Sequence, residues 1–180
     1  MDKNVLIISS SPRKDGNSDV LCNEFMKGAL ETGNTVKKIR LSEKKISYCT
    51  GCGICSETYK CVIDDDMAEL LELMLKADVI VLSTPVYFYS MNGQLKTFID
   101  RTFPRYQEMS NKEFYFILTA ADKDRYMMKK TLDALRGFTD DCLDNPIEKG
   151  FIAASGLWET GDVYKWEEYI AKAYEMGRNV

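Results

Sequence analysis

The amino-acid sequence predicts an α/β fold in which a doubly wound parallel sheet lies between two layers of helices. Short, wholly apolar runs recur at 5–8, 79–82 and 114–118, and each is typical of a buried strand. Stretches with apolar residues spaced three and four apart follow these runs, as in amphipathic helices. Because strands and helices alternate throughout the chain, right-handed crossovers between parallel strands are expected.

The first half of the chain contains three of the predicted strands. After the strand at 5–8, a helix is expected to begin at Asn17 or Ser18, which are favourable N-caps. Its apolar face consists of Cys22, Phe25, Met26 and Ala29. Residues 35–41 alternate imperfectly between apolar and charged side chains, and their lysines suit an edge strand. A helix with Met67, Leu70, Leu71 and Met74 on one face then leads to the strand at 79–82.

The second half adds two strands and completes the predicted fold. The strand at 79–82 ends in a loop at 83–93, and the helix after it has an apolar face made of Leu95, Phe98, Ile99 and Thr102. A strand at 114–118 precedes a helix at 124–143, and a weaker, interrupted strand at 147–154 precedes the last helix. Five strands and five helices in this order suit a flavodoxin-like, three-layer doubly wound five-stranded parallel sheet with the order 2-1-3-4-5.

Composition narrows the range of functions. Residues 1–180 fit a single domain, and a formal charge of −4 argues against a nucleic-acid or anionic membrane surface. No apolar run reaches the length of a membrane span and the chain opens on a strand rather than a signal peptide, so we expect a cytoplasmic protein. The sequence has no histidine, which excludes Ser–His and Cys–His dyads and histidine zinc sites. Any chemistry must come from other side chains or from a bound cofactor.

The loop after the first strand has the features of a phosphate-binding loop. It runs over 9–18, is rich in hydroxyl groups and leads into a helix N-terminus. The free N–H groups and the positive dipole end of a helix attract phosphate, and Arg13 can add a bidentate contact. The alternative is an ordinary polar loop with a helix cap.

A second loop is expected to face the first. In this fold the crevice forms at the carboxyl ends of strands 1 and 3, which places the 84–93 loop opposite the 9–18 loop. The second loop combines a proline with three aromatic residues and suits a flat apolar ring with polar edges. A Rossmann dinucleotide domain is disfavoured, because the first loop lacks the G-x-G-x-x-G pattern.

Three motifs resemble a known family. They are S-S-P-R-x-x-G-N-S after the first strand, T-P-V-Y-F-x-S-M-N-G-x-L-K-x-F-I-D-R after the third strand, and C-x2-C-x2-C-x5-C between them. Together they resemble the iron–sulfur flavoproteins and their NAD(P)H-dependent FMN reductase relatives, from the first strand to Arg101. The first loop departs from the T-x-T-G-x-T type of electron-carrier flavodoxins, which favours a reductase over a carrier.

The resemblance implies an FMN site with two walls. The first loop would hold the phosphate through Ser9, Ser11, Arg13, Asn17 and Ser18. The second loop would hold the isoalloxazine ring through Pro85, Val86, Tyr87, Phe88 and Tyr89. At the end of the fourth strand, Thr119 and Ala120 are expected to touch the flavin edge. For the three aromatic residues of the second loop, the alternative is a cluster buried in the core.

Four of the six cysteines form the third motif, Cys49, Cys52, Cys55 and Cys61. The two-residue gaps match those of ferredoxin clusters, so these cysteines are candidate ligands of one [4Fe–4S] cluster. A thiol loop without metal and a zinc site are the alternatives, while disulfides are disfavoured in a cytoplasmic chain. Cys22 and Cys142 are expected to be small buried hydrophobic residues. Lys96, Asp100 and Arg101 are expected to form a surface ion network.

The resemblance also implies an activity and an assembly. Hydride from NADH or NADPH would pass to FMN, and electrons would pass on to a cluster, a quinone or another acceptor. The alternatives are a non-catalytic flavin electron carrier or redox sensor, and a protein of this fold that binds no flavin. Relatives are usually homodimers or dimers of dimers with the flavin near an interface, and exposed residues at 87–91 would suit such an assembly.

Overall fold

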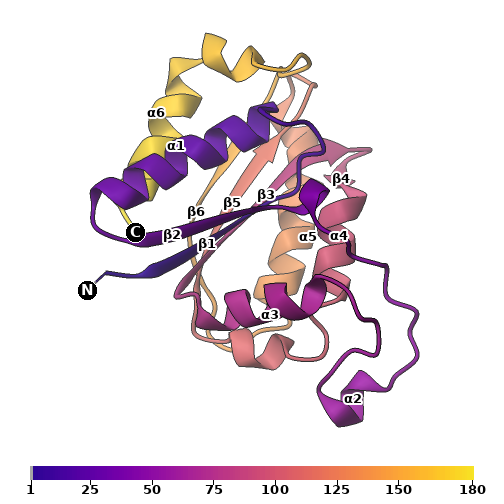
Figure 1. The fold of residues 1–180 in the computed structure, drawn as a ribbon. Coiled ribbons are helices and arrows are strands. Elements are labelled where there is room, and N and C mark those ends of the chain that lie inside the picture. The colour runs from indigo at the N-terminus through magenta and orange to yellow at the C-terminus, as the bar shows by residue number, and fades with distance from the viewer. Residues whose placement is uncertain (1) are drawn as a thin grey trace.

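A parallel sheet forms the centre of the computed structural model, which describes residues 2–180 (Figure 1). Its five parallel strands are β1 (Asn4–Ser9), β2 (Thr35–Arg40), β3 (Val79–Tyr87), β5 (Glu113–Thr119) and β6 (Ile147–Ala154). A sixth strand, β4 (Ser90–Met91), pairs antiparallel with the end of β3. Among residues 2–180, no helix has both the length and the apolar character needed to cross a bilayer.

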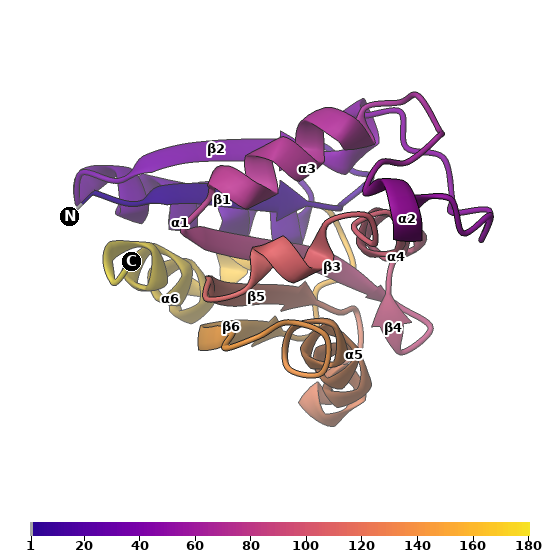
Figure 2. The same ribbon diagram turned by 90° about the horizontal axis from the view of Figure 1, so that it is seen from below.

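The order of the strands confirms the predicted topology. The sheet runs β2-β1-β3-β5-β6, which is 2-1-3-4-5 when only the parallel strands are counted (Figure 2). β2 lies at one edge, as its lysines indicate, and β6 lies at the other. The order reverses between β1 and β3, so a crevice is expected outside the carboxyl ends of these two strands.

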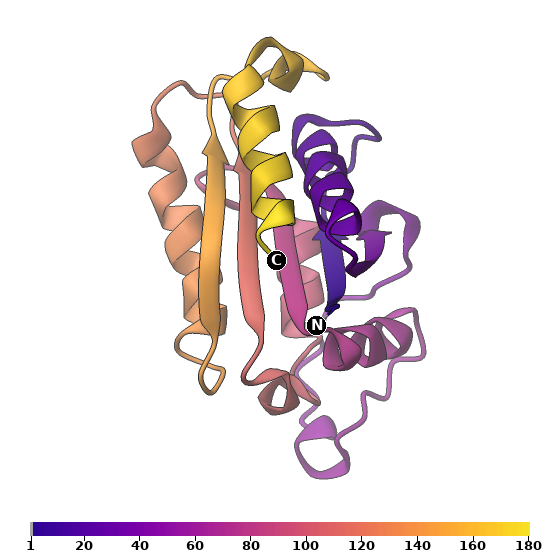
Figure 3. The same cartoon turned by 90° about the vertical axis from the view of Figure 1, so that its left-hand side faces the viewer.

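Two helical layers cover the sheet. One face packs against α1 (Asn17–Glu31) and α6 (Glu167–Arg178), which lie side by side in Figure 3. The other face packs against α3 (Met67–Lys76), α4 (Gly93–Asp100) and α5 (Lys129–Thr139). A hydrophobic core lies on each face of the sheet. Successive residues of each central strand pack into one core and then the other, because successive side chains of a strand point to opposite faces. The wholly apolar runs in the sequence follow from burial on both faces.

Three predicted elements have boundaries that differ from the structure. β3 continues to Tyr87 because Thr84 and Pro85 pair with β5 while Val86 and Tyr87 pair with β4. The helix predicted at 124–143 is α5, which begins at Lys129 because a 3₁₀ turn, Arg125–Met128, precedes it, and which already ends at Thr139. The N-cap of α1 is Gly16, so Asn17 and Ser18 are already helical.

The weak last strand is explained by a β-bulge. The register of β6 against β5 shifts between Phe114 and Tyr115, where Glu148 and Gly150 are the successive partners. Lys149 is therefore the extra residue of the bulge, which breaks the apolar alternation that a regular strand would show.

Helices α1 and α6 approach each other unusually closely. A Cβ atom added at Gly28 would lie 2.1 Å from the Tyr174 carbonyl oxygen, and one added at Gly177 would lie 2.0 Å from the Phe25 carbonyl oxygen. Both distances are far below van der Waals contact, so this crossing requires glycine on each helix.

Two predictions about single side chains are wrong. Cys142 is exposed, because it follows the end of α5, where its thiol donates to the Gly137 carbonyl oxygen at 3.3 Å. Arg101 is buried and pairs with Asp65, whereas only Lys96 and Asp100 form the expected surface pair. Cys22 is buried as predicted, and burial raises the pKa of its thiol to about 11.

Candidate functional site

A crevice of about 360 Å³ lies at the predicted position, at the carboxyl ends of β1, β3 and β5. Its walls come from the first loop, the end of β3, the end of β5 and the segment after β6. Seven predicted site residues line it: Ser11, Arg13, Asn17, Ser18, Pro85, Val86 and Tyr87. Thr119, which was also predicted, lines the crevice together with Ala121. Ala120, which was predicted to touch the flavin edge, is buried and does not line the crevice. Cavities of about 520 and 540 Å³ lie elsewhere, beside β6 and beneath the cysteines, and lack this ring of hydroxyl groups.

The first loop forms a cradle with one unsatisfied donor. The Ser18 hydroxyl, in the first turn of α1, is buried and has no hydrogen-bond partner within residues 2–180. The first N–H groups of a helix also lack partners within the helix, so an anion bound here would satisfy both. A Cβ atom at Gly16 would lie 2.7 Å from the Ser11 hydroxyl oxygen, which keeps this position open. The cradle therefore suits an anionic group beside Arg13.

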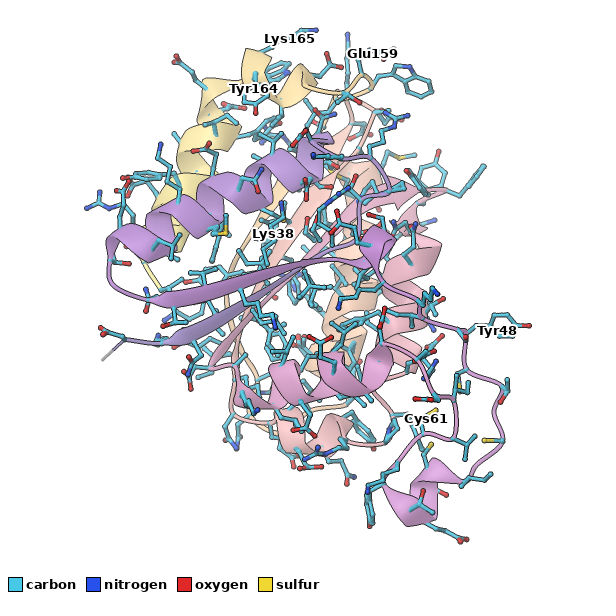
Figure 4. The ribbon with its side chains drawn as sticks, in the orientation of Figure 1. Lys38, Tyr48, Cys61, Glu159, Tyr164 and Lys165 are labelled. Atoms are coloured by element: carbon cyan, nitrogen blue, oxygen red, sulfur yellow. The ribbon has the colours of Figure 1, made fainter. Side chains whose placement is uncertain are left out.

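A buried carboxylate supports the cradle from below. The Ser9 hydroxyl donates to Asp19 at 2.7 Å, and the Asp15 N–H donates to it at 3.3 Å. Lys38 lies 2.7 Å from Asp19 and Arg40 lies 3.7 Å from it. Figure 4 shows Lys38 between β2 and α1. Burial raises the pKa of Asp19, but hydrogen bonds from Lys38 and Ser9 and the two positive charges lower it further, so the net shift is downward. The Asp19 carboxylate is thus ionised, and the positive charges of Lys38 and Arg40 balance its negative charge. It therefore does not repel an anion in the cradle.

Ser9 is consequently placed beneath the cradle and not in the crevice. Its side chain is fully buried, and its hydroxyl is used by Asp19. The sequence indicated a serine in the loop but gave no sign of a carboxylate partner ten residues later.

The second wall is a β-hairpin with an aromatic turn. Val86 and Tyr87 pair with β4, and Phe88 and Tyr89 form the two-residue turn with φ angles of 49° and 63°. Bulky residues rarely adopt positive φ, although two-residue hairpins demand it. Tyr87 lines the crevice, whereas Phe88 is fully exposed and Tyr89 lies near Lys130. None of the three belongs to the core, so a buried aromatic cluster is excluded for them.

Asn92 joins the two walls, and its role was missed from the sequence. Its side-chain amide donates to the Ser10 carbonyl oxygen at 2.6 Å. Its side-chain oxygen accepts from the Leu95 N–H at 3.2 Å and caps α4, while its own N–H donates to Thr84 at 3.0 Å. An asparagine before a helix predicts the cap, but nothing local predicts the bond to the first loop.

A further wall comes from the segment after β6. Asn17 donates to the Glu159 carbonyl oxygen at 2.9 Å and accepts from the Val163 N–H at 3.1 Å. Arg13 donates to the Trp158 carbonyl oxygen at 3.2 Å, and Asp162 accepts from the Trp158 N–H at 3.0 Å. Asn17 therefore fixes this segment, and the exposed Trp158 indole stands at the edge of the crevice.

The four motif cysteines lie on one protruding segment, residues 47–65, which we call the cysteine segment. Figure 1 shows it leaving the body of the molecule around the short helix α2 (Cys55–Thr58). Cys49 and Cys52 are exposed, while Cys55 and Cys61 are half-buried. Burial raises the pKa of the Cys55 thiol, and the nearby thiols of Cys61, Cys52 and Cys49 raise it further against a backbone hydrogen bond.

The cysteine segment gathers the thiols without closing them around a centre. Among residues 2–180, no three Cys, Asp or Glu side chains stand at metal-ligand positions. Gly51 and Gly53 have φ angles of 66° and 77°, and the space beside each is open. The donor chemistry and the spacing fit a cluster, and the open loop around these glycines leaves room for the thiols to converge.

The sequence of the chain was compared with models of known protein families. The sequence model of the NADPH-dependent FMN reductase family matches residues 3–138. The chain belongs to this family. The match covers every strand except β6 and includes the cradle, the hairpin and the cysteine segment of this family member.

The most similar sequences include iron-sulfur flavoproteins of archaea. One from Archaeoglobus fulgidus is 44% identical over 97 residues, which make up 54% of this chain and 44% of that protein. One from Methanocaldococcus jannaschii is 42% identical over 100 residues, which make up 56% of this chain and 52% of that protein. The matched part of the chain spans about half the length of these relatives.

Solved structures share the fold of this family member. An NAD(P)H:quinone oxidoreductase from Methanothermobacter marburgensis superposes with a TM-score of 0.79 at 16% identity, covering 99% of this chain and 96% of that one. An FMN-dependent NADH-azoreductase from Bacillus anthracis, in complex with FMN, gives a TM-score of 0.74 at 14% identity, covering 98% of each chain. At such identities the likeness confirms the flavodoxin-like fold alone.

Proposed function

We propose that the protein is an FMN-dependent oxidoreductase that takes hydride from NAD(P)H and passes electrons to an acceptor. The observation that carries the proposal is the cradle, where the buried Ser18 hydroxyl has no partner among residues 2–180 and lies in the first turn of α1, beside the crevice. The membership of the NADPH-dependent FMN reductase family supports it. The proposal includes a cytoplasmic location, where thiols stay reduced.

The residues of the crevice fit FMN in two parts. Ser11, Arg13 and Ser18 would hold the phosphate, because hydroxyl and guanidinium donors satisfy its oxygens. Pro85, Val86 and Tyr87 would line the flat ring, with Thr119 at its edge. The flavin itself supplies two-electron chemistry, so the chain needs no side-chain base, which agrees with a sequence without histidine.

The function is tested by the spectrum and the turnover of the purified protein. We expect FMN at about one per chain and steady-state oxidation of NADH or NADPH when an artificial quinone is added. A protein with FMN but without turnover would be an electron carrier or a redox sensor. A protein that takes up no FMN on titration would overturn the proposal.

The cysteine segment is proposed to hold one [4Fe–4S] cluster as an electron acceptor. Four thiols with ferredoxin spacing support it, and so does the similarity of the chain to iron-sulfur flavoproteins. Two electrons would then enter together as hydride from NAD(P)H, and they would leave one at a time through the cluster.

Anaerobic reconstitution should give about four irons and four sulfides per chain. Cys52→Ser should remove the iron and leave FMN, because Cys52 lies outside the crevice. Cys142→Ser is the matched control, since that thiol is exposed but lies outside the segment. Zinc in place of iron, or no metal in the wild-type protein, would leave a flavin reductase with a thiol loop.

A homodimer or a dimer of dimers is proposed because the hairpin exposes aromatic side chains next to the crevice. Phe88 is fully exposed, and the turn holds it in a conformation that bulky residues avoid. Light scattering of the FMN-loaded protein should give a multiple of the 20.6 kDa chain mass. Phe88→Ser should shift it toward the monomer, whereas Tyr126→Ser, at another exposed aromatic residue, should not. A wild-type monomer at micromolar concentration would contradict the proposal.

A further inference from the structure

Arg101 joins the two ends of the cysteine segment. It follows α4, and its side chain is only 2% exposed. Its two terminal nitrogens form a bidentate pair with the Asp65 carboxylate at 2.8 and 2.9 Å, and one of them also donates to the Ser47 carbonyl oxygen at 2.6 Å. Asp65 in turn accepts from the Ser47 N–H at 2.9 Å. One guanidinium therefore fixes the residue where the segment begins and the residue where it ends.

The same guanidinium has a donor left over. Its Nε–H is buried and has no hydrogen-bond partner in the part of the chain that the structure describes, although a buried unpaired donor is costly. Cys61 and Arg101 both line the 540 Å³ cavity beneath the segment. Burial lowers the pKa of Arg101, but the Asp65 carboxylate and then Cys61 raise it, for a net upward shift. Figure 4 shows Cys61 on the arm of the segment that returns toward α3.

We propose that Arg101 is a positioning residue of the cysteine segment, which clamps its two ends and directs the Nε–H toward the Cys61 sulfur. The inference rests on the proposed function in one respect, since the sulfur acts as a ligand only when a cluster is bound. The clamp itself is independent of any metal.

The arrangement has a consequence for the reduction potential. Hydrogen bonds to cluster sulfurs and nearby positive charge stabilise the more negative, reduced form and raise the potential. Lysine has no planar fork, so it can replace the charge of Arg101 but not the bidentate pair together with the Nε–H. Arg101→Lys thus separates the charge from the geometry.

Three variants test the proposal. Arg101→Lys keeps the charge, and Asp65→Asn with Arg101→Gln removes both charges together, which avoids leaving a buried carboxylate alone. Lys96→Ala is the control, because it breaks an exposed pair within α4, the helix that Arg101 follows. Two measurements apply to every variant: protease cleavage within residues 47–65, and, after anaerobic reconstitution, iron content with a potentiometric titration followed by electron paramagnetic resonance.

We expect the protease to cut Arg101→Lys and the double variant within the segment at least about tenfold faster than the wild type. The circular dichroism spectra of both variants should match that of the wild type, which shows that the overall fold is unchanged. In both variants we expect the equilibrium constant for reduction of the cluster to fall about tenfold. This corresponds to a reduction potential that is lower by about 59 mV for one electron. Lys96→Ala should change neither value.

Unchanged cleavage in both Arg101 variants overturns the clamp, and an unchanged potential with four irons bound overturns the bond to Cys61. If the wild type binds no iron, the cluster assignment fails and the cleavage rates alone decide on Arg101. A variant that loses iron while it resists cleavage would also contradict the proposal, because Arg101 would then act on the ligands without holding the segment.

Discussion

Replacing Ser11 and Arg13 together with alanine is expected to weaken FMN binding by about 3 kcal/mol, or more than a hundredfold in Kd. Both side chains line the cradle, and hydrogen bonds to a charged partner contribute about 1.5–3 kcal/mol each. Titration of the apoprotein with FMN, followed by the quenching of flavin fluorescence, measures the effect.

Riboflavin provides the sharper form of this experiment. It has the same ring but no phosphate, so the double substitution should change its Kd by less than about threefold. Lys14→Ala is the matched control in the same loop, because Lys14 is exposed and does not line the crevice. An equal loss for FMN and riboflavin would mean that the substitutions damage the crevice in general. No loss for FMN would remove the phosphate assignment.

Gly177→Ala is expected to lower the free energy of unfolding by about 3 kcal/mol, at the upper end of the range for overpacked cores. The added methyl group would meet the Phe25 carbonyl oxygen at 2.0 Å, and backbone atoms give way less easily than a flexible side chain. Helices α1 and α6 would have to separate along their whole crossing. Urea denaturation followed by circular dichroism measures the change.

Gly137→Ala serves as the control for that result. It also lies in a helix, α5, and its nearest neighbour would be the Asp141 carboxylate at 3.8 Å, an ordinary contact. Alanine there should stabilise the protein by about 0.5–1 kcal/mol through helix propensity. Equal effects of the two substitutions would show that the close approach of α1 and α6 does not limit stability.

The fold could be predicted because its signals are local. Apolar runs such as 79–82 and 114–118 mark strands that are buried on both faces, and alternation with helices sets the parallel order. The extension of β3 to Tyr87 was missed, because it depends on pairing with Ser90 across a turn. That turn has two aromatic residues where sequence rules expect asparagine or glycine.

The site was predictable in part for the same reason. The cradle follows directly from a strand, a hydroxyl-rich loop and a helix, so the sequence placed Ser11, Arg13 and Ser18 at the crevice that they line. The burial of Arg101 was missed because its partner Asp65 lies 36 residues earlier in the chain. The bonds of Asn17 to the segment after β6 were missed because both ends of its amide bind residues more than 140 positions away.

The bonds of Asn17 have a consequence for the order of folding. Its side-chain oxygen accepts from Val163, 146 residues further along the chain, and this contact closes the wall of the crevice that carries Trp158. Contacts between residues so distant in sequence form late, because the entropy of closing the intervening loop must be overcome first. The cradle and hairpin precede β6 and α6 in the chain and are synthesised before them, yet the complete crevice exists only after β6 and α6 have docked. Acquisition of the flavin would therefore mark the end of folding and would stabilise the native chain from that moment on.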